Sequence, residues 1–119
     1  MEFAESSGMR VIYMEEFCKL GEDKVIAETR RVVGEGPTYI SFDVDGLDPK
    51  LCPNTGTPVQ GGLETEQVFY MIKAILKTGR KLIGFDLCEV GTGENDWDAN
   101  VGARVLWRLC NLLIMSNKE

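Results

Sequence analysis

Histidine is absent from the 119 residues of this chain, and its cysteines are few and widely separated. The four, Cys18, Cys52, Cys88 and Cys110, include no Cys-x-x-Cys pair. The chain therefore offers neither the ligand spacing of a zinc cage nor a Cys–His nucleophilic pair. The spacing instead predicts free thiols. Because Cys18, Cys88 and Cys110 stand among apolar residues, we expect these three to be small buried hydrophobic side chains.

Long runs of one residue type are also missing. There is no extended Lys/Arg run and no apolar run of membrane-spanning length, and the formal net charge is −6. This composition argues against nucleic acid or an anionic membrane as a partner. Residues 1–7 carry acid and lack the basic and apolar regions of a signal peptide. We therefore expect a cytoplasmic protein with at most one domain.

The chain does contain an apolar, aromatic run that ends in acid. After Gly36-Pro37, the run Tyr39–Phe42 predicts a buried parallel strand. Residues two apart on a strand share a face, so Asp43 and Asp45 are expected to present their carboxylates side by side. Such a pair repels unless a cation lies between the carboxylates or one of them keeps its proton. A loop rich in proline and glycine follows, at the strand end where open α/β sheets place their sites.

The residues alone leave two interpretations of this acidic pair. Paired oxygen anions suit Mg²⁺ or Mn²⁺, but the same aspartates could simply cap a loop or turn. An EF-hand calcium loop starting at Asp43 is excluded, because glycine is absent at its sixth position and Asn54 stands at its twelfth.

The remaining segments alternate between strand and helix patterns. We expect a strand at Arg10–Met14, a helix at Glu22–Val33, a helix from Glu64 to Gly79, a strand at Lys81–Asp86, and a helix at Ala99–Met115 with Asp98 as its N-cap. This order predicts an α/β fold, a three-layer α/β/α arrangement with a parallel sheet. Three helices cover both faces of such a sheet only marginally, so we expect part of a larger fold. An exposed parallel edge also predicts a homo-oligomer.

Residues 41–63 resemble the third signature of the ureohydrolases, the family of arginase, agmatinase and formimidoylglutamase. The segments Ser-Phe-Asp-Val-Asp-Gly-Leu-Asp-Pro, Pro-Asn-Thr-Gly-Thr-Pro and Gly-Gly-Leu reproduce its residues and spacing. The resemblance extends loosely from Gly8 and tightly from Gly36 to Val90. It implies that residues 1–119 are a single, incomplete C-terminal segment of the larger arginase-like fold. The segment Gly36–Asp43 leans towards agmatinase-like members over arginase.

The resemblance also implies roles for individual residues. In ureohydrolases the Asp-x-Asp segment binds two manganese ions, so Asp43 would bridge both ions and Asp45 would ligate one. The ions activate the water that attacks the guanidinium carbon. Glu89, a catalytic residue by this resemblance, would pair with the substrate guanidinium, and Thr57 would line the pocket. Asp86 also fits the family pattern. Judged without the family, Glu89 could be a surface acid at a strand end.

The chain departs from the family pattern in three places. Asn54 stands where a small residue is usual, and Gly91-Thr92-Gly93 replaces Asn-Pro or Ser-Pro-Pro. The upstream Gly-Gly-Asp-His and Asp-Ala-His-x-Asp segments, which supply the other metal ligands, are missing. We therefore expect a Mn²⁺-dependent hydrolase of a small guanidino compound (agmatine, arginine or similar), releasing urea and an amine, of which this chain alone has little or no activity.

Two alternatives belong to other classes. One is a non-catalytic assembly module that retains the fold. The other is a haloacid dehalogenase-like phosphatase, in which Asp43 would be the nucleophile and Asp45 the acid. Leu47 and the segment Thr55–Leu63 do not fit the phosphatase pattern.

Overall fold

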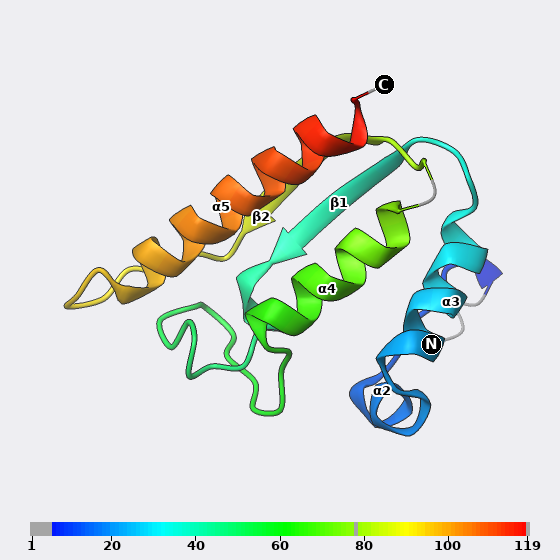
Figure 1. Ribbon diagram of the computed structural model, residues 1–119. Coiled ribbons are helices and arrows are strands. Elements are labelled where there is room, and N and C mark those ends of the chain that lie inside the picture. The colour runs from blue at the N-terminus through cyan, green and yellow to red at the C-terminus, as the bar shows by residue number, and fades with distance from the viewer. Residues whose placement is uncertain (1–5, 78, 119) are drawn as a thin grey trace.

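A computed structural model describes residues 6–77 and 79–118, which form a parallel pair of strands with helices beside it (Figure 1). The elements, in chain order, are α2 (Met14–Leu20), α3 (Glu22–Val33), β1 (Thr38–Asp43), the 3-10 turn η1 (Val44–Gly46), α4 (Thr65–Leu76), β2 (Leu82–Cys88) and α5 (Trp97–Ser116). The α/β class with a parallel sheet is thus confirmed. None of the described helices is long and apolar enough to cross a membrane. Residues 1–5, within the segment that lacks signal-peptide features, lie outside the described residues.

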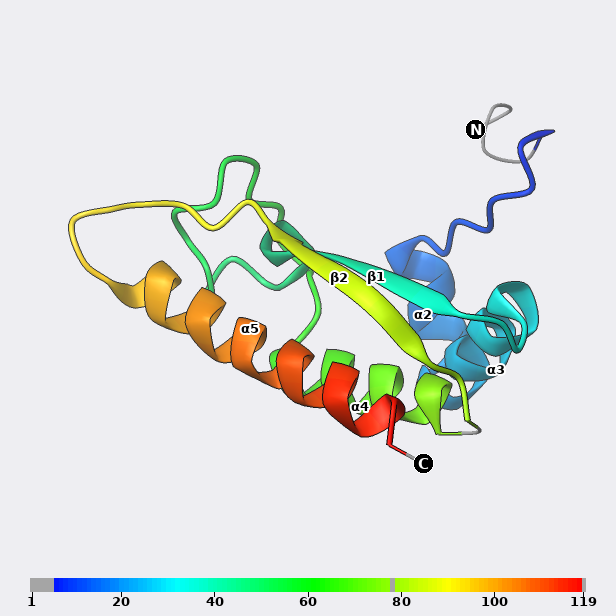
Figure 2. The same cartoon turned by 90° about the horizontal axis from the view of Figure 1, so that it is seen from above.

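The two strands pair in a register that runs, after an irregularity near Thr38, from Tyr39 opposite Gly84 to Asp43 opposite Cys88. Figure 2 shows α4 and α5 on one face of this sheet, and no helix of residues 6–77 and 79–118 covers the other face. One helical layer of the predicted three-layer arrangement is therefore present here. The main core lies between sheet and helices, and its buried side chains are Phe42, Val44, Leu47, Cys52, Phe69, Leu76, Leu82, Val105, Leu109 and Leu112.

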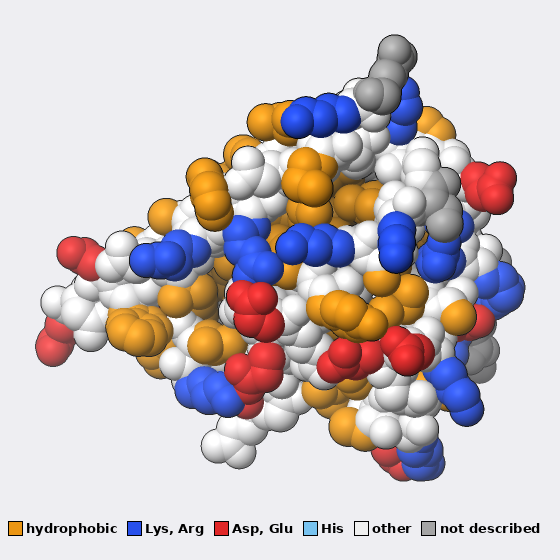
Figure 3. All heavy atoms as spheres, viewed as in Figure 1, with side chains coloured by type: hydrophobic (Ala, Val, Ile, Leu, Met, Phe, Trp, Pro, Cys, Tyr) orange, Lys and Arg blue, Asp and Glu red, His pale blue; other side chains and the backbone are white. Residues whose placement is uncertain are grey.

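A second, smaller core joins α3 to α4. Val25 and Ile26 of α3 are buried together with Met71 of α4. Outside this core, α5 exposes apolar side chains on its outer face (Figure 3), namely Leu106, Trp107, Ile114 and Met115. The amphipathic pattern predicted for α5 therefore holds on the sheet side, while its outer face keeps a further apolar surface.

The predicted strand at Arg10–Met14 is wrong. Residues 10–13 have no regular secondary structure, and Met14 begins α2 instead. Acids in the first turn of α2 and Lys19 in its last turn suit the helix dipole. Arg10 donates hydrogen bonds to Glu16 and Glu28, so the segment is tied to helices and not to a strand partner. The sheet formed by the described residues consequently has two strands instead of three.

The prediction that the cysteines are free thiols is confirmed, but the prediction that Cys18, Cys88 and Cys110 are buried is wrong. All four thiols are free, but Cys18, Cys88 and Cys110 are exposed, whereas Cys52 is buried. Cys18 belongs to α2, which buries no residue, and Cys88 ends a strand on the uncovered sheet face. Apolar neighbours in sequence do not decide burial when the covering layer comes from elsewhere.

The end of α4 and the end of α3 are joined by one buried side chain. Arg80 donates from Nε to the carbonyl of Gly34, from Nη1 to the carbonyl of Ile75 at 3.2 Å, and from Nη2 to the carbonyl of Arg30 at 3.4 Å. The last carbonyls of a helix lack intrahelical donors, so a buried guanidinium here satisfies several at once. The Arg80 side chain therefore holds the ends of α3 and α4 together, just before the chain enters β2.

We predict that Arg80→Ala lowers the free energy of unfolding by about 2–3 kcal/mol, because it leaves buried carbonyls without donors. Urea unfolding followed by circular dichroism measures the loss. Arg104→Ala, on the exposed side of α5, is the matched control and should change stability by less than about 0.5 kcal/mol. Equal losses for the two variants would contradict the assignment.

A second prediction concerns Glu28, whose carboxylate accepts hydrogen bonds from Arg31 and Arg10. These bonds lower the pKa of Glu28 from 4.5 to about 2. A lowered pKa of an acid stabilises the folded state above pH 4.5, and this contribution should be lost as the pH falls towards 2. Urea unfolding measured at several pH values should show a shallower pH dependence in this window for Glu28→Gln. The same dependence of unfolding free energy on pH in the wild type and in Glu28→Gln would contradict this prediction.

Candidate active site

The loop after β1 is closed at both ends, which places its middle against the strand ends. Leu47 and Leu63 form a parallel bridge, with Leu63 N donating to Gly46 O at 3.0 Å and Asp48 N donating to Leu63 O at 2.9 Å. Gly62 permits this close approach, because a Cβ there would lie 2.5 Å from the Leu47 carbonyl carbon. Residues 47–63 therefore form a compact loop at the carboxyl end of β1, where the sequence places the candidate site.

Asp43 and Asp45 lie next to each other, but not through strand alternation. β1 ends at Asp43, and Asp45 lies in the turn η1, where its backbone N donates to Asp43 Oδ1 at 3.1 Å. Asp43 therefore caps the turn, as one of the two interpretations of this pair proposed. Capping engages one lone pair of a carboxylate that has about four, so it leaves Asp43 able to accept a cation.

The loop also reaches Asp45 and Glu89. Thr57 donates from Oγ1 to Asp45 Oδ2 at 2.7 Å. Thr55 donates from Oγ1 to the backbone O of Glu89, also at 2.7 Å. Glu89 follows the last residue of β2 and has φ 66°, the left-handed region that costs about 1 kcal/mol or more for a side-chain-bearing residue. The Thr55 hydroxyl holds the carbonyl of this strained residue in place.

Three carboxylates consequently share this edge of the sheet. The pKa of Asp43 is raised, first because partial burial disfavours its charge and then because the carboxylates of Asp45 and Glu89 lie close. A Cβ on Gly56 would lie 3.2 Å from Glu89 Oε2, so the glycine makes room for that carboxylate beside the loop. The edge favours a positive partner. Within residues 6–77 and 79–118, however, no group of three or more His, Cys, Asp or Glu side chains could hold a metal ion.

A fourth acid, Asp86, organises the uncovered sheet face. It accepts hydrogen bonds from Ser41 Oγ at 2.8 Å, Tyr39 Oη at 3.1 Å and Cys88 Sγ at 3.3 Å. These donors, Ser41 foremost, lower the pKa of Asp86. Sequence reasoning missed Ser41, although its position two residues before Asp43 on the same strand face could have indicated it.

Asp98 does not cap α5, so that prediction is wrong. Asp96 occupies the N-cap position, and Asp98 lies within the first turn with 1 % of its surface exposed. Its carboxylate instead accepts two hydrogen bonds from Asn54, one from the backbone N at 2.9 Å and one from Nδ2 at 3.0 Å. This contact joins residues 44 apart in the chain, and the predicted helix pattern contained no signal for it.

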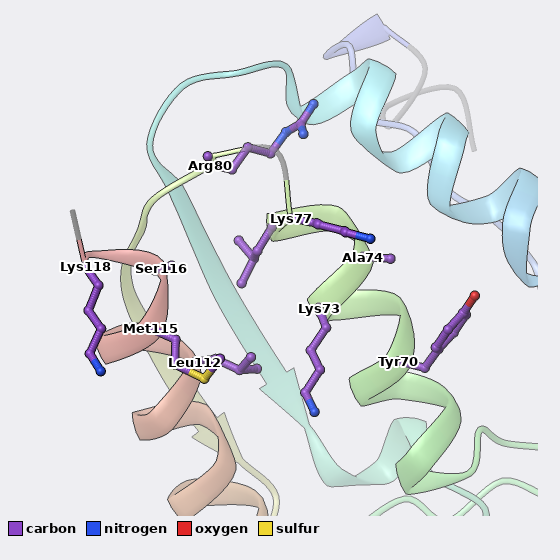
Figure 4. A pocket seen from close by; sticks show the side chains of 11 residues that line it. Tyr70, Lys73, Ala74, Lys77, Arg80, Leu112, Met115, Ser116 and Lys118 are labelled. Atoms are coloured by element: carbon purple, nitrogen blue, oxygen red, sulfur yellow. The ribbon is translucent and has the colours of Figure 1, made fainter.

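A cavity of about 560 Å³ lies elsewhere, between the ends of α4 and α5 (Figure 4). Its lining includes the apolar side chains of Leu76, Leu112 and Met115. The Lys73 and Lys77 side chains extend in different directions in Figure 4, so they do not converge on one ligand position. None of the sequence-predicted site residues lines this cavity. The carboxylate edge remains the candidate site.

Comparisons with known proteins identify relatives of this arrangement. The family model of the arginase family matches residues 1–111. The chain is 46% identical over 116 residues to a guanidinopropionase of Pseudomonas aeruginosa, covering 96% of this chain and 36% of the relative. It is 35% identical over 106 residues to an agmatinase of Proteus mirabilis, covering 87% of this chain and 34% of that enzyme.

Solved structures give the same result. A proclavaminate amidino hydrolase from Streptomyces clavuligerus superposes with a TM-score of 0.85 at 29% identity, covering 98% of this chain and 38% of that one. An arginase from Bacillus caldovelox superposes with a TM-score of 0.75 at 26% identity, covering 99% of this chain and 38% of the arginase. The chain thus spans roughly a third of the length of its curated relatives. Its sequence and its arginase-like fold establish that it belongs to the arginase family of ureohydrolases.

Proposed function

We propose that residues 1–119 are the C-terminal portion of a Mn²⁺-dependent ureohydrolase that hydrolyses a small guanidino compound to urea and an amine. The observation that carries the proposal is the gathering of Asp43, Asp45 and Glu89 at the carboxyl ends of two parallel strands, with Thr57 bound to Asp45. Open α/β sheets bind ligands at this edge. These residues come from the segments that resemble the ureohydrolase signature.

Asp43 and Asp45 would hold the metal. Carboxylate oxygens suit Mn²⁺. The pKa of Asp43 is raised first by burial and then by the neighbouring carboxylates of Asp45 and Glu89, whose negative charge a cation would compensate. When bound, a pair of manganese ions supplies the Lewis acidity that makes water a nucleophile at neutral pH. A six-coordinate cation needs more ligands than two carboxylates. The histidine-free chain therefore supplies a share of the site, and we expect it to have little or no activity alone.

Glu89 would bind the substrate. A carboxylate can accept two parallel hydrogen bonds from a guanidinium, and these orient the planar group as well as attract it. The Thr55 hydroxyl fixes the Glu89 backbone, and Gly56 leaves room for its carboxylate. Thr57 donates to one oxygen of Asp45 and so restrains the orientation of that carboxylate. The chain's own residues thus position a guanidinium beside the metal ligands.

The substrate is most consistent with a guanidino acid. Identity is higher to the guanidinopropionase and to a guanidinobutyrase, at 46% and 44%, than to the agmatinase of Proteus mirabilis, at 35%. The segment Gly36–Asp43 leans towards agmatinase-like members, so agmatine is the second substrate to test. A complete protein carrying this segment would be assayed for urea release from 3-guanidinopropionate, 4-guanidinobutyrate, agmatine and arginine.

We further propose a cytoplasmic homo-oligomer. The exposed apolar face of α5 (Figure 3) and the unpaired edges of the two-stranded sheet of residues 6–77 and 79–118 support association. Membership of the arginase family disfavours the phosphatase alternative. A non-catalytic assembly module is the remaining alternative, and titration with Mn²⁺ combined with a measurement of self-association separates it from a ureohydrolase segment.

We predict that calorimetric titration of the purified chain with Mn²⁺ detects only weak binding, because two carboxylates leave most of the coordination sphere to water, and that Asp43→Asn combined with Asp45→Asn abolishes it. Asp48→Asn is the matched control, since Asp48 lies in the same loop and accepts the backbone N of Lys50 in a local turn. It should keep wild-type affinity. Heat signals that are the same in all three proteins, together with stable self-association of the chain, would favour the assembly module.

We also predict that Asp43→Asn stabilises the metal-free chain at pH 7, by about 0.5 kcal/mol or less after solvent screening. The folded state raises the pKa of Asp43, so ionised Asp43 opposes folding above its unfolded pKa, and this cost should disappear as the pH falls below it. The advantage of the variant should therefore shrink below pH 4. Thermal unfolding of both proteins at several pH values measures this difference in stability. A variant less stable than the wild type at pH 7 would refute the claim that the Asp43 charge opposes folding.

A further inference from the structure

The departures of this chain from the family pattern lie against one another in space. The Asn54 backbone O is so close to Gly91 that a Cβ there would lie 1.8 Å from it. The Asn54 side-chain amide covers Gly93 in the same way, with Cγ, Oδ1 and Nδ2 each 2.7 Å from an added Cβ. No real side chain tolerates such distances. The larger side chain at position 54 therefore fits because position 93 is glycine, and Gly91 makes room for the backbone at position 54.

The same asparagine is held by a buried acid. Asp98 directs its two oxygens to the backbone N and the Nδ2 of Asn54 at 2.9 and 3.0 Å. A buried carboxylate is tolerated when it is fully hydrogen-bonded, and its place in the first turn of α5 adds the favourable helix dipole. Burial and, after it, the charge of Asp98 raise the pKa of the neighbouring Cys52 thiol. Asp98 thus fastens α5 to the loop at Asn54.

The three residues that follow Asn54 are the ones that contact the candidate site. Thr55 bonds the Glu89 carbonyl, Gly56 lies beside the Glu89 carboxylate, and Thr57 bonds the Asp45 carboxylate. A loop segment this short transmits the position of its first residue, because each peptide unit is planar and only two torsions per residue can adjust. The place of Asn54 therefore sets where these contacts fall.

We propose that Asn54 and Asp98, with Gly91 and Gly93 making room, form a clamp that positions residues 55–57 and through them Asp45 and Glu89. The clamp residues are positioning residues, since they touch neither of the two carboxylates that they place. The functional meaning of this placement rests on the proposed ureohydrolase site. The contacts of the clamp itself can be tested without any ligand.

The first test is a double-variant cycle on the metal-free chain, measured as the midpoint of urea unfolding. Gly93→Ala should lower the midpoint strongly, because its Cβ meets the Asn54 amide. In the Asn54→Ala background the amide is gone, so Gly93→Ala should have little further effect. If Gly93→Ala alone fails to fold while the double variant folds, the coupling is equally established. Gly93→Ala effects of equal size in both backgrounds would overturn the clamp.

Gly91→Ala is the matched control for this cycle. Its added Cβ meets the backbone O of Asn54 and not the side chain, so Asn54→Ala should not rescue it. Rescue of both glycine variants to the same degree would mean that Asn54→Ala merely loosens the loop. That result would also overturn the clamp.

The second test exchanges the two polar partners. In Asn54→Asp plus Asp98→Asn, the amide placed at position 98 can accept from the backbone N at position 54 and donate to the carboxylate placed there, so both hydrogen bonds can persist. Each single variant weakens the contact: Asn54→Asp sets two carboxylates against each other, and Asp98→Asn removes the charge that strengthens both bonds. Amide exchange at position 54 should speed up about tenfold in Asn54→Asp and less in Asp98→Asn, and it should slow again in the exchanged pair, which restores one amide and one carboxylate.

Positioning is read from the amide signals of Asp45 and Glu89 in two-dimensional NMR spectra. They should move in each single variant and return in the exchanged pair. Trp97→Phe, which removes the 2.9 Å bond from Trp97 Nε1 to Leu51 O at the start of the loop, should leave them in place. Single variants that speed up exchange at position 54 without moving these signals would reduce Asn54 and Asp98 to a local structural contact and overturn the proposal.

Mn²⁺ titration of the same proteins separates this inference from the proposed function. If the signals of Asp45 and Glu89 follow the clamp but neither the wild type nor any variant binds Mn²⁺, the clamp stands and the metal-site proposal fails. If Mn²⁺ binds equally well in all proteins while those signals do not move, the metal site stands and the clamp is overturned.

Discussion

The register of β1 against β2 is the constraint on which the rest of the site depends. Asp43 lies opposite Cys88 in the last pair of this ladder, so the next residues of both strands leave the sheet at one point. Asp45 and Glu89 are brought together for that reason, although 44 residues separate them in the chain. A slip of one residue would turn every strand side chain to the other face. The buried contacts of Phe42 and Leu82 against the helices oppose such a slip.

Local features made much of this fold predictable. The helix expected at Glu22–Val33 has these bounds in the structure, because acids begin it, arginines end it and Gly34 follows in the left-handed region. The strand predicted at Tyr39–Phe42 is β1 in the structure. Gly36-Pro37 before the aromatic run and the acids after it marked its two ends. Helix caps, the order of charges along a helix and the periodicity of apolar residues all act within a few residues. They can therefore be predicted from a single sequence.

The features that could not be predicted all depend on distant partners. The segment Arg10–Met14 has strand composition, yet Arg10 bonds to Glu28 of α3 and Met14 starts a helix. Cys88 has apolar neighbours but lies on a sheet face that no helix of residues 6–77 and 79–118 covers. Asp98 is an aspartate at the start of a helical pattern, as an N-cap would be, but its carboxylate accepts hydrogen bonds from Asn54 instead. No local pattern in the sequence indicated that contact.

The acids at this edge differ in how far hydrogen bonding compensates their charge. Asp86 accepts three side-chain donors and Asp98 accepts two from Asn54, which suits carboxylates with structural roles. Asp43 accepts a backbone donor and Asp45 a hydroxyl, and burial followed by the nearby carboxylates raises the pKa of Asp43. Within residues 6–77 and 79–118, no Lys or Arg side chain forms an ion pair with Asp43, Asp45 or Glu89. A cation and a guanidinium are the partners that these remaining charges would favour most.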